Sequence, residues 1–247
     1  MMRQFFLGAV MVGLLFAAGC LSTGKESVDD ILAKMRKAID PDGLSSKITT
    51  QVVTSKIVSP DIKDGKLVVE VKYPDKLRIK AESKEGVFMK GCDGKRGWEF
   101  TTKKGLREIK DRELGNLKFQ IVFLSPKEKI KDVFESVDLE GEENVGKKPC
   151  YKFICTPKAM YGMEPLDIYV DKKTYLVVKT EEVHIGPKNE KIEITRHFLD
   201  YEKTNGIYFP MKIISESAGK IVELSVESIS WDQDLSDTAF DIPDEIK

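Results

Sequence analysis

Cys20 is the residue whose surroundings most clearly predict chemistry. It follows the small residues Ala17–Gly19 at the end of an uncharged apolar run from Phe5 to Ala18. The run is too short for a membrane-spanning helix, which needs roughly 18 to 20 apolar residues, and it fits the apolar region of a signal peptide. We therefore predict a lipoprotein signal peptide at residues 1–19 and a diacylglyceryl thioether on the Cys20 thiol. The alternative is an ordinary secretory signal with a cysteine there by chance.

Lipidation predicts where the protein resides. Two acyl chains hold a domain at a membrane, whereas one chain gives only marginal binding. Residues 20–26 are small, polar and rich in helix breakers, as a short tether should be. We expect a protein of the cell envelope, lipid-anchored and facing away from the cytoplasm.

Other reactive side chains do not form a recognisable constellation in the sequence. His184 and His197 each fall in a predicted strand among charged residues, where we expect them to be solvated. The adjacent glutamates at 142–143 and 181–182 point in opposite directions on a strand, so we interpret them as solvated charges. No nucleophile motif, Cys-x-x-Cys pair or histidine cluster occurs. We predict no catalytic residues, no metal, no cofactor, and a protein that is not an enzyme.

Three cysteines remain after Cys20. Cys150 and Cys155 are five residues apart in a predicted strand, on opposite faces and about 17 Å from each other, so they should not bond together. A bridge from Cys92 to either of them is possible and would leave one free thiol.

Composition argues against a nucleic-acid partner. Lys and Arg total 40 against 41 Asp and Glu, without the basic excess of nucleic-acid binders. We expect a monomer with a single domain at residues 27–247.

The periodicity predicts one helix followed by many strands. Ser27 can cap a helix with Asp30 as its capping-box partner, and the apolar stripe of that helix ends at Ile39. Short alternating segments and turn signals then predict roughly a dozen strands in one continuous antiparallel meander. Residues 111–137 interrupt the alternation and predict two short helices that lie across the open face of the sheet.

Three motifs occur in order along the chain. They are the turn 93–98 (Asp-Gly-Lys-x-x-Trp), the hairpin 169–176 (Tyr-Val-Asp-x-x-Thr-x-Leu), and Tyr201 with 205–210 (Asn-Gly-Ile-x-Phe-Pro). Together they resemble the Lol-type outer-membrane lipoprotein carrier and sorting proteins. The sequence departs from that pattern at Val177, where many relatives have proline. The resemblance implies a mainly β (α+β) fold, a single curved antiparallel sheet in an unclosed half-barrel with an N-terminal helix and a helical lid. It also implies that acyl chains are held in the concavity.

The apolar positions of strands and lid give candidate ligand contacts, because an apolar cleft favours a ligand that gains free energy with each buried methylene. The candidate cavity lining is Leu77, Ile79, Phe88 or Met89, Trp98, Phe100, Ile168, Val170, Phe209 and Met211, and the candidate lid residues are Leu117, Phe119, Ile121 and Val122. The alternative is that these residues form an ordinary core, and that Trp98 is a buried anchor of the sheet.

Two functions follow from this interpretation. The first is a membrane-anchored protein that binds acyl chains of lipoproteins or other lipids as a carrier or acceptor. The second is an envelope-stress sensor or scaffold that uses the same fold to bind another protein.

Overall fold

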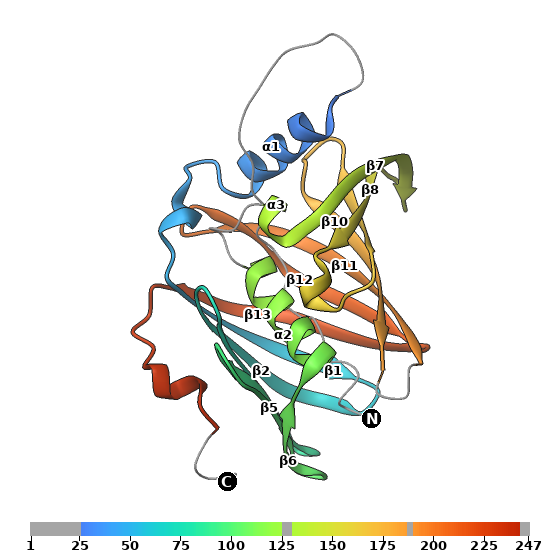
Figure 1. Ribbon diagram of the computed structural model, residues 1–247. Coiled ribbons are helices and arrows are strands. Elements are labelled where there is room, and N and C mark those ends of the chain that lie inside the picture. Colours follow the sequence, from blue (N-terminus) through green and yellow to red (C-terminus); the bar gives the residue numbers. More distant parts are fainter. Residues whose placement is uncertain (1–25, 125–129, 187–189, 243–247) are drawn as a thin grey trace.

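A computed structural model describes residues 26–124, 130–186 and 190–242 (Figure 1). The predicted signal peptide and Cys20 lie outside these residues. The N-terminal helix α1 spans Val28–Ile39, and both halves of the predicted capping box are present, since Ser27 and Asp30 each accept from the backbone of the other. Ile31, Leu32, Met35 and Ile39 are buried, which confirms the predicted apolar stripe.

Thirteen antiparallel strands form one sheet. The strands are β1 (Thr50–Ser59), β2 (Ile62–Lys72), β3 (Lys76–Ser83), β4 (Gly86–Asp93), β5 (Gly97–Thr101), β6 (Gly105–Ile109), β7 (Phe134–Val145), β8 (Lys148–Pro157), β9 (Leu166–Asp171), β10 (Val177–Ile185), β11 (Lys191–Thr204), β12 (Ile207–Ser217) and β13 (Lys220–Trp231).

The order of the strands shows how the sheet is built. It runs β6-β5-β4-β3-β2-β1-β13-β12-β11-β10-β9-β8-β7, so the chain starts in the middle, winds out to one edge and returns from the other. The predicted continuous meander is thus two meanders, joined where β1 pairs with β13. Edges β6 and β7 do not pair with each other, so the sheet is open, and the predicted half-barrel is confirmed.

Two helices connect the edges of the sheet. After β6 the chain crosses through α2 (Asp111–Leu124) and α3 (Ile130–Val133) to β7 at the opposite edge. A connection between opposite edges must pass over one face of the sheet, and Figure 1 shows α2 and α3 in front of the strands. The predicted helices across the open face are therefore confirmed.

Strand β7 differs from the prediction. Phe134, assigned to a helix from its spacing, is the first residue of this strand. The strand is largely exposed because it lies at the edge of the sheet, so its apolar alternation is weak. Only Val137 and Leu139, which pack against the core, alternate with charged neighbours.

Short 3-10 turns complete the structure: η2 (Leu44–Lys47), η3 (Ala159–Tyr161) and η4 (Asp237–Phe240). None of the described helices has the length and apolar character that crossing a membrane requires. Cys92, Cys150 and Cys155 are all buried and free, so Cys150 and Cys155 are unbonded as predicted, and the possible bridge from Cys92 is not formed.

Candidate ligand-binding site

Strands β2 and β3 are apolar on the concave face of the first meander. The register pairs Val69 with Ile79 and Val71 with Leu77, so these side chains share one face. Each of them is at most 5% exposed. They belong to the main hydrophobic core, which also includes the lid residues of α2, so this is the face that the helix covers.

The second meander provides the opposite wall of the same core. Ile168 pairs with Phe153, and Val170 pairs with Tyr151, which places all four side chains on one face. Phe209 lies on the interior side of β12, and Met211 is half-buried against the same core. The predicted residues Leu77, Ile79, Ile168, Val170, Phe209 and Met211 are therefore brought together.

Met89, Trp98 and Phe100 lie elsewhere. In the register Met89 pairs with Phe100 and Gly91 pairs with Trp98, so these side chains point to one face of the sheet. Leu77 pairs with Cys92, whose side chain points to the other face. Because successive residues of a strand point to opposite faces, these three side chains lie on the convex side. The predicted lining is corrected there: Phe88, the alternative to Met89, faces the interior opposite Ala81, and Trp98 is a buried anchor on the outside.

Helix α2 occupies the concavity. Leu117, Phe119 and Ile121 are at most 1% exposed, and Val122 is half-buried. The ring of Phe119 lies edge-on to those of Phe134 and Tyr161, at centroid distances of 5.8 and 5.5 Å. The four predicted lid residues thus come from a helix that packs into the sheet with aromatic contacts at its side.

A pocket of about 520 Å³ opens at the rim of the half-barrel, between the start of α1 and the edge of the sheet. Its volume is in the range of sites for small ligands. The pocket lining combines charged, aromatic and apolar side chains, namely Glu26, Leu139, Gly141, Glu142, Tyr151 and Lys172. Sequence reasoning missed it, because it joins the N-terminal segment to a strand more than a hundred residues later.

Glu26 ties the N-terminal segment to this rim. Its carboxylate accepts hydrogen bonds from the hydroxyls of Tyr151 at 2.8 Å and Tyr175 at 3.1 Å, and it contacts the Lys34 ammonium. The bond from Lys34 lowers the pKa of Glu26, with the tyrosine hydroxyls adding to the effect. Burial, and then the Glu26 carboxylate, raises the pKa of Tyr151.

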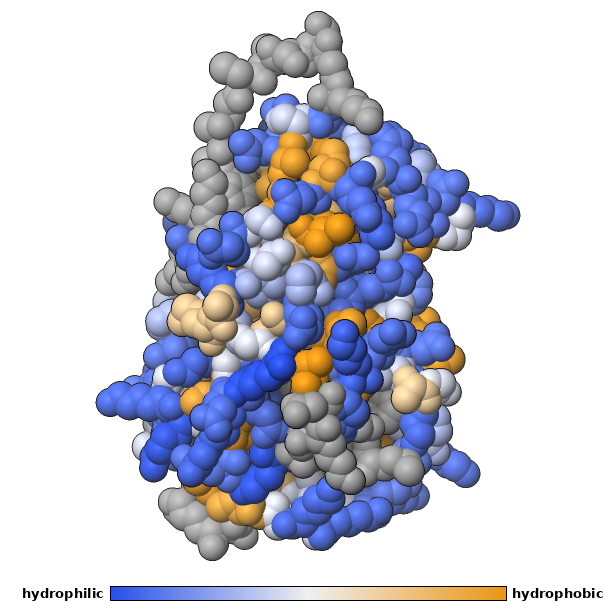
Figure 2. Space-filling view, turned by 45° about the vertical axis from the view of Figure 1, so that its right-hand side comes forward, coloured by the Kyte–Doolittle hydropathy of each residue, from blue (hydrophilic) through white to orange (hydrophobic). Residues whose placement is uncertain are grey.

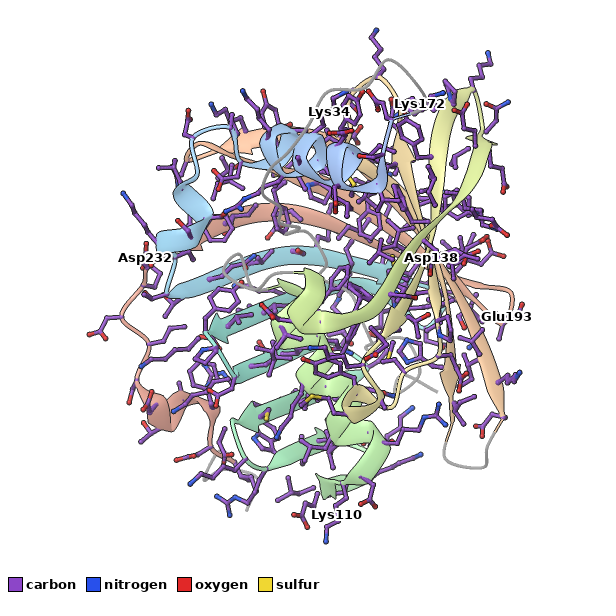
Figure 3. All side chains as sticks on the ribbon, turned by 45° about the horizontal axis from the view of Figure 1, so that its top comes forward. Lys34, Lys110, Asp138, Lys172, Glu193 and Asp232 are labelled. Carbon is purple, nitrogen blue, oxygen red and sulfur yellow. The ribbon has the colours of Figure 1, made fainter. Side chains whose placement is uncertain are left out.

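The rim has a cationic and aromatic surface. The Lys34 ammonium lies 5.0 Å from the centroid of the Tyr175 ring, and the Lys172 ammonium lies at the same distance from the centroid of Tyr151. Figure 3 shows Lys34 and Lys172 at the same end of the molecule. Figure 2, in which the side carrying β7 and β8 comes forward, shows an apolar strip between charged side chains.

The floor of the concavity carries buried polar groups. Thr180 pairs with Arg196, and Arg196 with Ser215, so a polar row crosses three strands on the interior face. Glu182 and His184 follow on that face of β10, each 4% exposed. The expectation of solvated side chains is thus wrong for both. Glu181 faces the outer side, as the predicted opposite orientation requires, and accepts from the Tyr169 hydroxyl at 2.7 Å.

Ionic contacts organise this floor. The Glu182 carboxylate contacts Arg196, and its Oε2 lies 3.0 Å from His184 Nε2. Burial, followed by the charges of Lys90 and Arg112, lowers the pKa of His184 to about 4, so the imidazole is neutral at pH 7. No sequence signal separates this buried histidine from a solvated one, because the neighbours that matter come from β4, β11 and α2.

The sheet is strongly curved (Figure 1). Interior residues of both meanders belong, together with residues of α2, to one hydrophobic core.

These features define an open half-barrel with a helix in its concavity and a pocket at its rim. Residues 119–243, about half of the chain, match a family model with the description "Uncharacterized protein", and the chain belongs to that family. The comparison with curated proteins gives no match.

Solved structures share the fold. A DUF1329 family protein from Desulfovibrio piger is 16% identical over 80% of this chain and 91% of its own, with a TM-score of 0.55. A putative outer membrane lipoprotein-sorting protein domain from Vibrio parahaemolyticus is 13% identical over 78% and 89%, with a TM-score of 0.54. A LolA superfamily protein from Nitrosomonas europaea is 16% identical over 85% and 95%, with a TM-score of 0.55. At these identities the likeness shows the fold, and the predicted resemblance to Lol-type proteins is confirmed at that level.

Proposed function

We propose that this protein binds acyl chains of lipids or lipoproteins between the concave face of its sheet and helix α2, as a lipid-anchored protein of the cell envelope. The observation that carries the proposal is the apolar interior surface formed by both meanders and covered by a helix instead of a second sheet. Leu77 and Ile79 lie on one wall of it, and Ile168 and Val170 on the other.

Helix α2 can move without disrupting the sheet. Every interior strand pairs with two other strands, so displacing α2 breaks none of the sheet hydrogen bonds. The displacement removes Leu117, Phe119 and Ile121 from the core, at about 1.5 to 3 kcal/mol each. About ten methylenes of an acyl chain, at about 0.8 kcal/mol each, offset that cost. The free energy lost by displacing the helix is close to the free energy gained by burying the acyl chain, so binding would be reversible.

The rim pocket supplies an entrance. It is lined by Leu139 and Tyr151, whose side chains belong to the interior face, and by charged residues at the surface. An acyl chain can enter along the apolar side while a polar head group stays at the charged side. The lipoprotein-sorting protein domain from Vibrio parahaemolyticus and the LolA superfamily protein from Nitrosomonas europaea support the proposal only through the shared fold.

The proposed anchor places this entrance near a membrane. Glu26, fixed at the rim, follows Cys20 by six residues, which reach at most about 21 Å when extended. With lipid on Cys20, the rim would stay within that distance of the bilayer. The protein would then act as a local acceptor rather than a diffusing carrier.

The test is a photoreactive fatty acid bound to the chain from Ser22 onward, which contains every described element. After illumination, mass spectrometry maps the labelled residues, and lipids that co-purify are identified separately. We expect saturable labelling at interior positions such as Ile168, Val170 and Met211. Met89 and Phe100 on the convex face serve as the internal control. No saturable labelling, or labelling confined to the convex face, would exclude the proposal.

A further inference from the structure

The rim pocket is built around a carboxylate that the protein holds in place. The Glu26 carboxylate accepts hydrogen bonds from the hydroxyls of Tyr151 at 2.8 Å and Tyr175 at 3.1 Å. The Lys34 ammonium contacts the same carboxylate. The two tyrosine rings stack with their centroids 6.4 Å apart. One wall of the pocket therefore carries a fixed negative charge, held by residues from α1, β8 and the β9–β10 hairpin.

A second, more exposed ion pair also lines the pocket. The Lys172 ammonium lies 2.6 Å from a carboxylate oxygen of Glu142, and these side chains are 30% and 51% exposed. The same ammonium lies 5.0 Å from the centroid of the Tyr151 ring, which keeps it at the pocket. An exposed ion pair contributes at most about 1 kcal/mol to stability. A ligand can therefore separate Lys172 from Glu142 at small cost.

Two backbone irregularities shape this region. Tyr175 has a φ of 57°, a conformation that is unfavourable for a bulky residue and easy for glycine. Glycine would relieve the strain but would remove the hydroxyl that binds Glu26. On β7 the register shifts between Leu139 and Gly141, which is a β-bulge, and a Cβ added at Gly141 meets no atom within 4 Å. Strained residues and bulges are frequent at binding sites.

The charges of the pocket select a ligand that carries both signs. A lone anion placed between Lys172 and Glu142 would face two carboxylates, those of Glu142 and Glu26. A lone cation placed there would separate the Lys172 ammonium from its carboxylate and repel it. A zwitterion gives each side chain of the pair a new partner of opposite charge, so that one ion pair becomes two.

The pocket also continues into the apolar interior. Leu139 and Tyr151 line the pocket, and both side chains are part of the main hydrophobic core or pack against it. Tyr151 pairs in the register with Val170, which is fully buried on the interior face. A zwitterionic group bound at the rim can therefore be joined to acyl chains that lie in the concavity.

We propose that the rim pocket binds the phosphoethanolamine head group of a phospholipid, with the phosphate at Lys172 and the primary ammonium at Glu142. A primary ammonium donates hydrogen bonds to a carboxylate, and Glu26 supplies a second carboxylate on the wall of the pocket. The quaternary ammonium of a choline head group has no such donor. This inference rests on the proposed function and deepens it, because it names the head group of the lipid whose chains the interior binds.

The experiment measures how well three phospholipids displace a fluorescent fatty acid from the chain starting at Ser22. The phospholipids have identical acyl chains of medium length and are used below their micelle concentrations. Their head groups are phosphoethanolamine, phosphocholine and the anionic phosphoglycerol. We expect the wild type to bind the first about three- to fivefold more tightly than either of the others, the effect of one additional, partly exposed ion pair.

Two variants test the two charges of the pocket separately. Glu142→Gln should bring the affinities for phosphoethanolamine and phosphocholine lipids close to each other and tighten phosphoglycerol binding about twofold, because a carboxylate near the anion is removed. Lys172→Gln should weaken all three phospholipids about three- to fivefold, because each contains a phosphate. The matched control is Glu140→Gln on the same strand. Glu140 forms an ion pair of similar exposure with Lys152 at 2.6 Å but does not line the pocket, so the three affinities should stay unchanged.

The outcomes separate this inference from the proposed function. Equal binding of the three phospholipids by the wild type, or a preference that persists in Glu142→Gln, overturns the head-group site and leaves acyl-chain binding intact. The same holds if none of the phospholipids displaces a fatty acid that does bind. Tighter binding of phosphoglycerol than of phosphoethanolamine overturns the choice of a zwitterion. If the fluorescent fatty acid itself does not bind, the proposed function fails and the inference fails with it.

Discussion

The indole nitrogen of Trp98 donates a hydrogen bond to the backbone carbonyl of Phe240 at 3.0 Å, joining residues 142 positions apart. The bond lies on the convex side of the sheet, where the Trp98 ring packs over Gly91 and η4 approaches β3 and β4. Phe240 is fully buried. The C-terminal segment therefore seals the outside of the first meander, while α2 fills its inside.

Replacing Trp98 with Phe should lower the free energy of unfolding by about 1 to 3 kcal/mol, because the buried Phe240 carbonyl loses its donor. Denaturant titration measures the change. Fatty-acid affinity should stay the same, since the residue lies on the face away from the proposed ligand. If the variant had normal stability but weaker lipid binding, Trp98 would belong to the lining of the ligand cavity.

Acid should destabilise the protein through His184. The unfolded histidine has a pKa near 6.5, and burial, Lys90 and Arg112 lower it to about 4 in the folded state. Between these pH values the unfolded state binds the proton and the folded state does not, so stability falls as the pH drops through this window. The loss amounts to at most about 3 kcal/mol.

Urea titrations between pH 7 and pH 4 measure this loss, and His184→Gln should show a correspondingly smaller one. Carboxylates that titrate in the same range cancel in the difference between wild type and variant. His197→Gln, which changes a half-buried histidine of the neighbouring strand, is the matched control. Equal losses in wild type and His184→Gln would show that the imidazole is accessible to protons in the folded state.

Thiol chemistry should follow burial. Cys92, Cys150 and Cys155 are free and at most 2% exposed, and burial raises the pKa of each thiol. The chain from Ser22 onward should react slowly with a disulfide reagent in its native state and release three thiols after denaturation. Two missing thiols under oxidising conditions would instead reveal a bridge.

The packing of α2 can be tested at Gly115. A Cβ added there would lie 2.7 Å from the Tyr161 carbonyl oxygen, a backbone atom of η3, so Gly115→Ala must push the helix away from that turn. We expect a loss of about 1 to 3 kcal/mol and faster uptake of a fluorescent fatty acid, since the cover is loosened. Stopped-flow fluorescence measures the rate.

The control for this helix variant is Gly91→Ala on β4, where an added Cβ would lie 2.5 Å from the Trp98 ring on the convex face. It should lower the stability but leave the uptake rate unchanged, because it does not touch α2. Slower uptake in Gly115→Ala would contradict a movable α2.

Local patterns in the sequence predicted most of the elements. The capping box at Ser27 and Asp30 fixed the start of α1, and alternation with turn residues located the strands other than β7. These signals are readable because they depend on neighbours a few residues apart. The edge strand β7 was not predicted, because an exposed edge strand needs little apolar alternation.

The sequence also predicted the interior position of Leu77, Ile79, Ile168 and Val170 correctly. It placed Met89, Trp98 and Phe100 on the wrong face of the sheet. Both faces of β4 and β5 are buried, one by α2 and the other by the C-terminal segment, so burial alone could not distinguish inside from outside.

Sequence alone determined most of the element types, because hydrophobic periodicity is a property of short segments, and the half-barrel class came from the resemblance to Lol-type proteins. Only the tertiary structure decided that His184, Glu182 and Thr180 lie buried in the interior. Their environment is created by β4, β11 and α2, which reach them because the sheet curls and the chain crosses from one edge to the other.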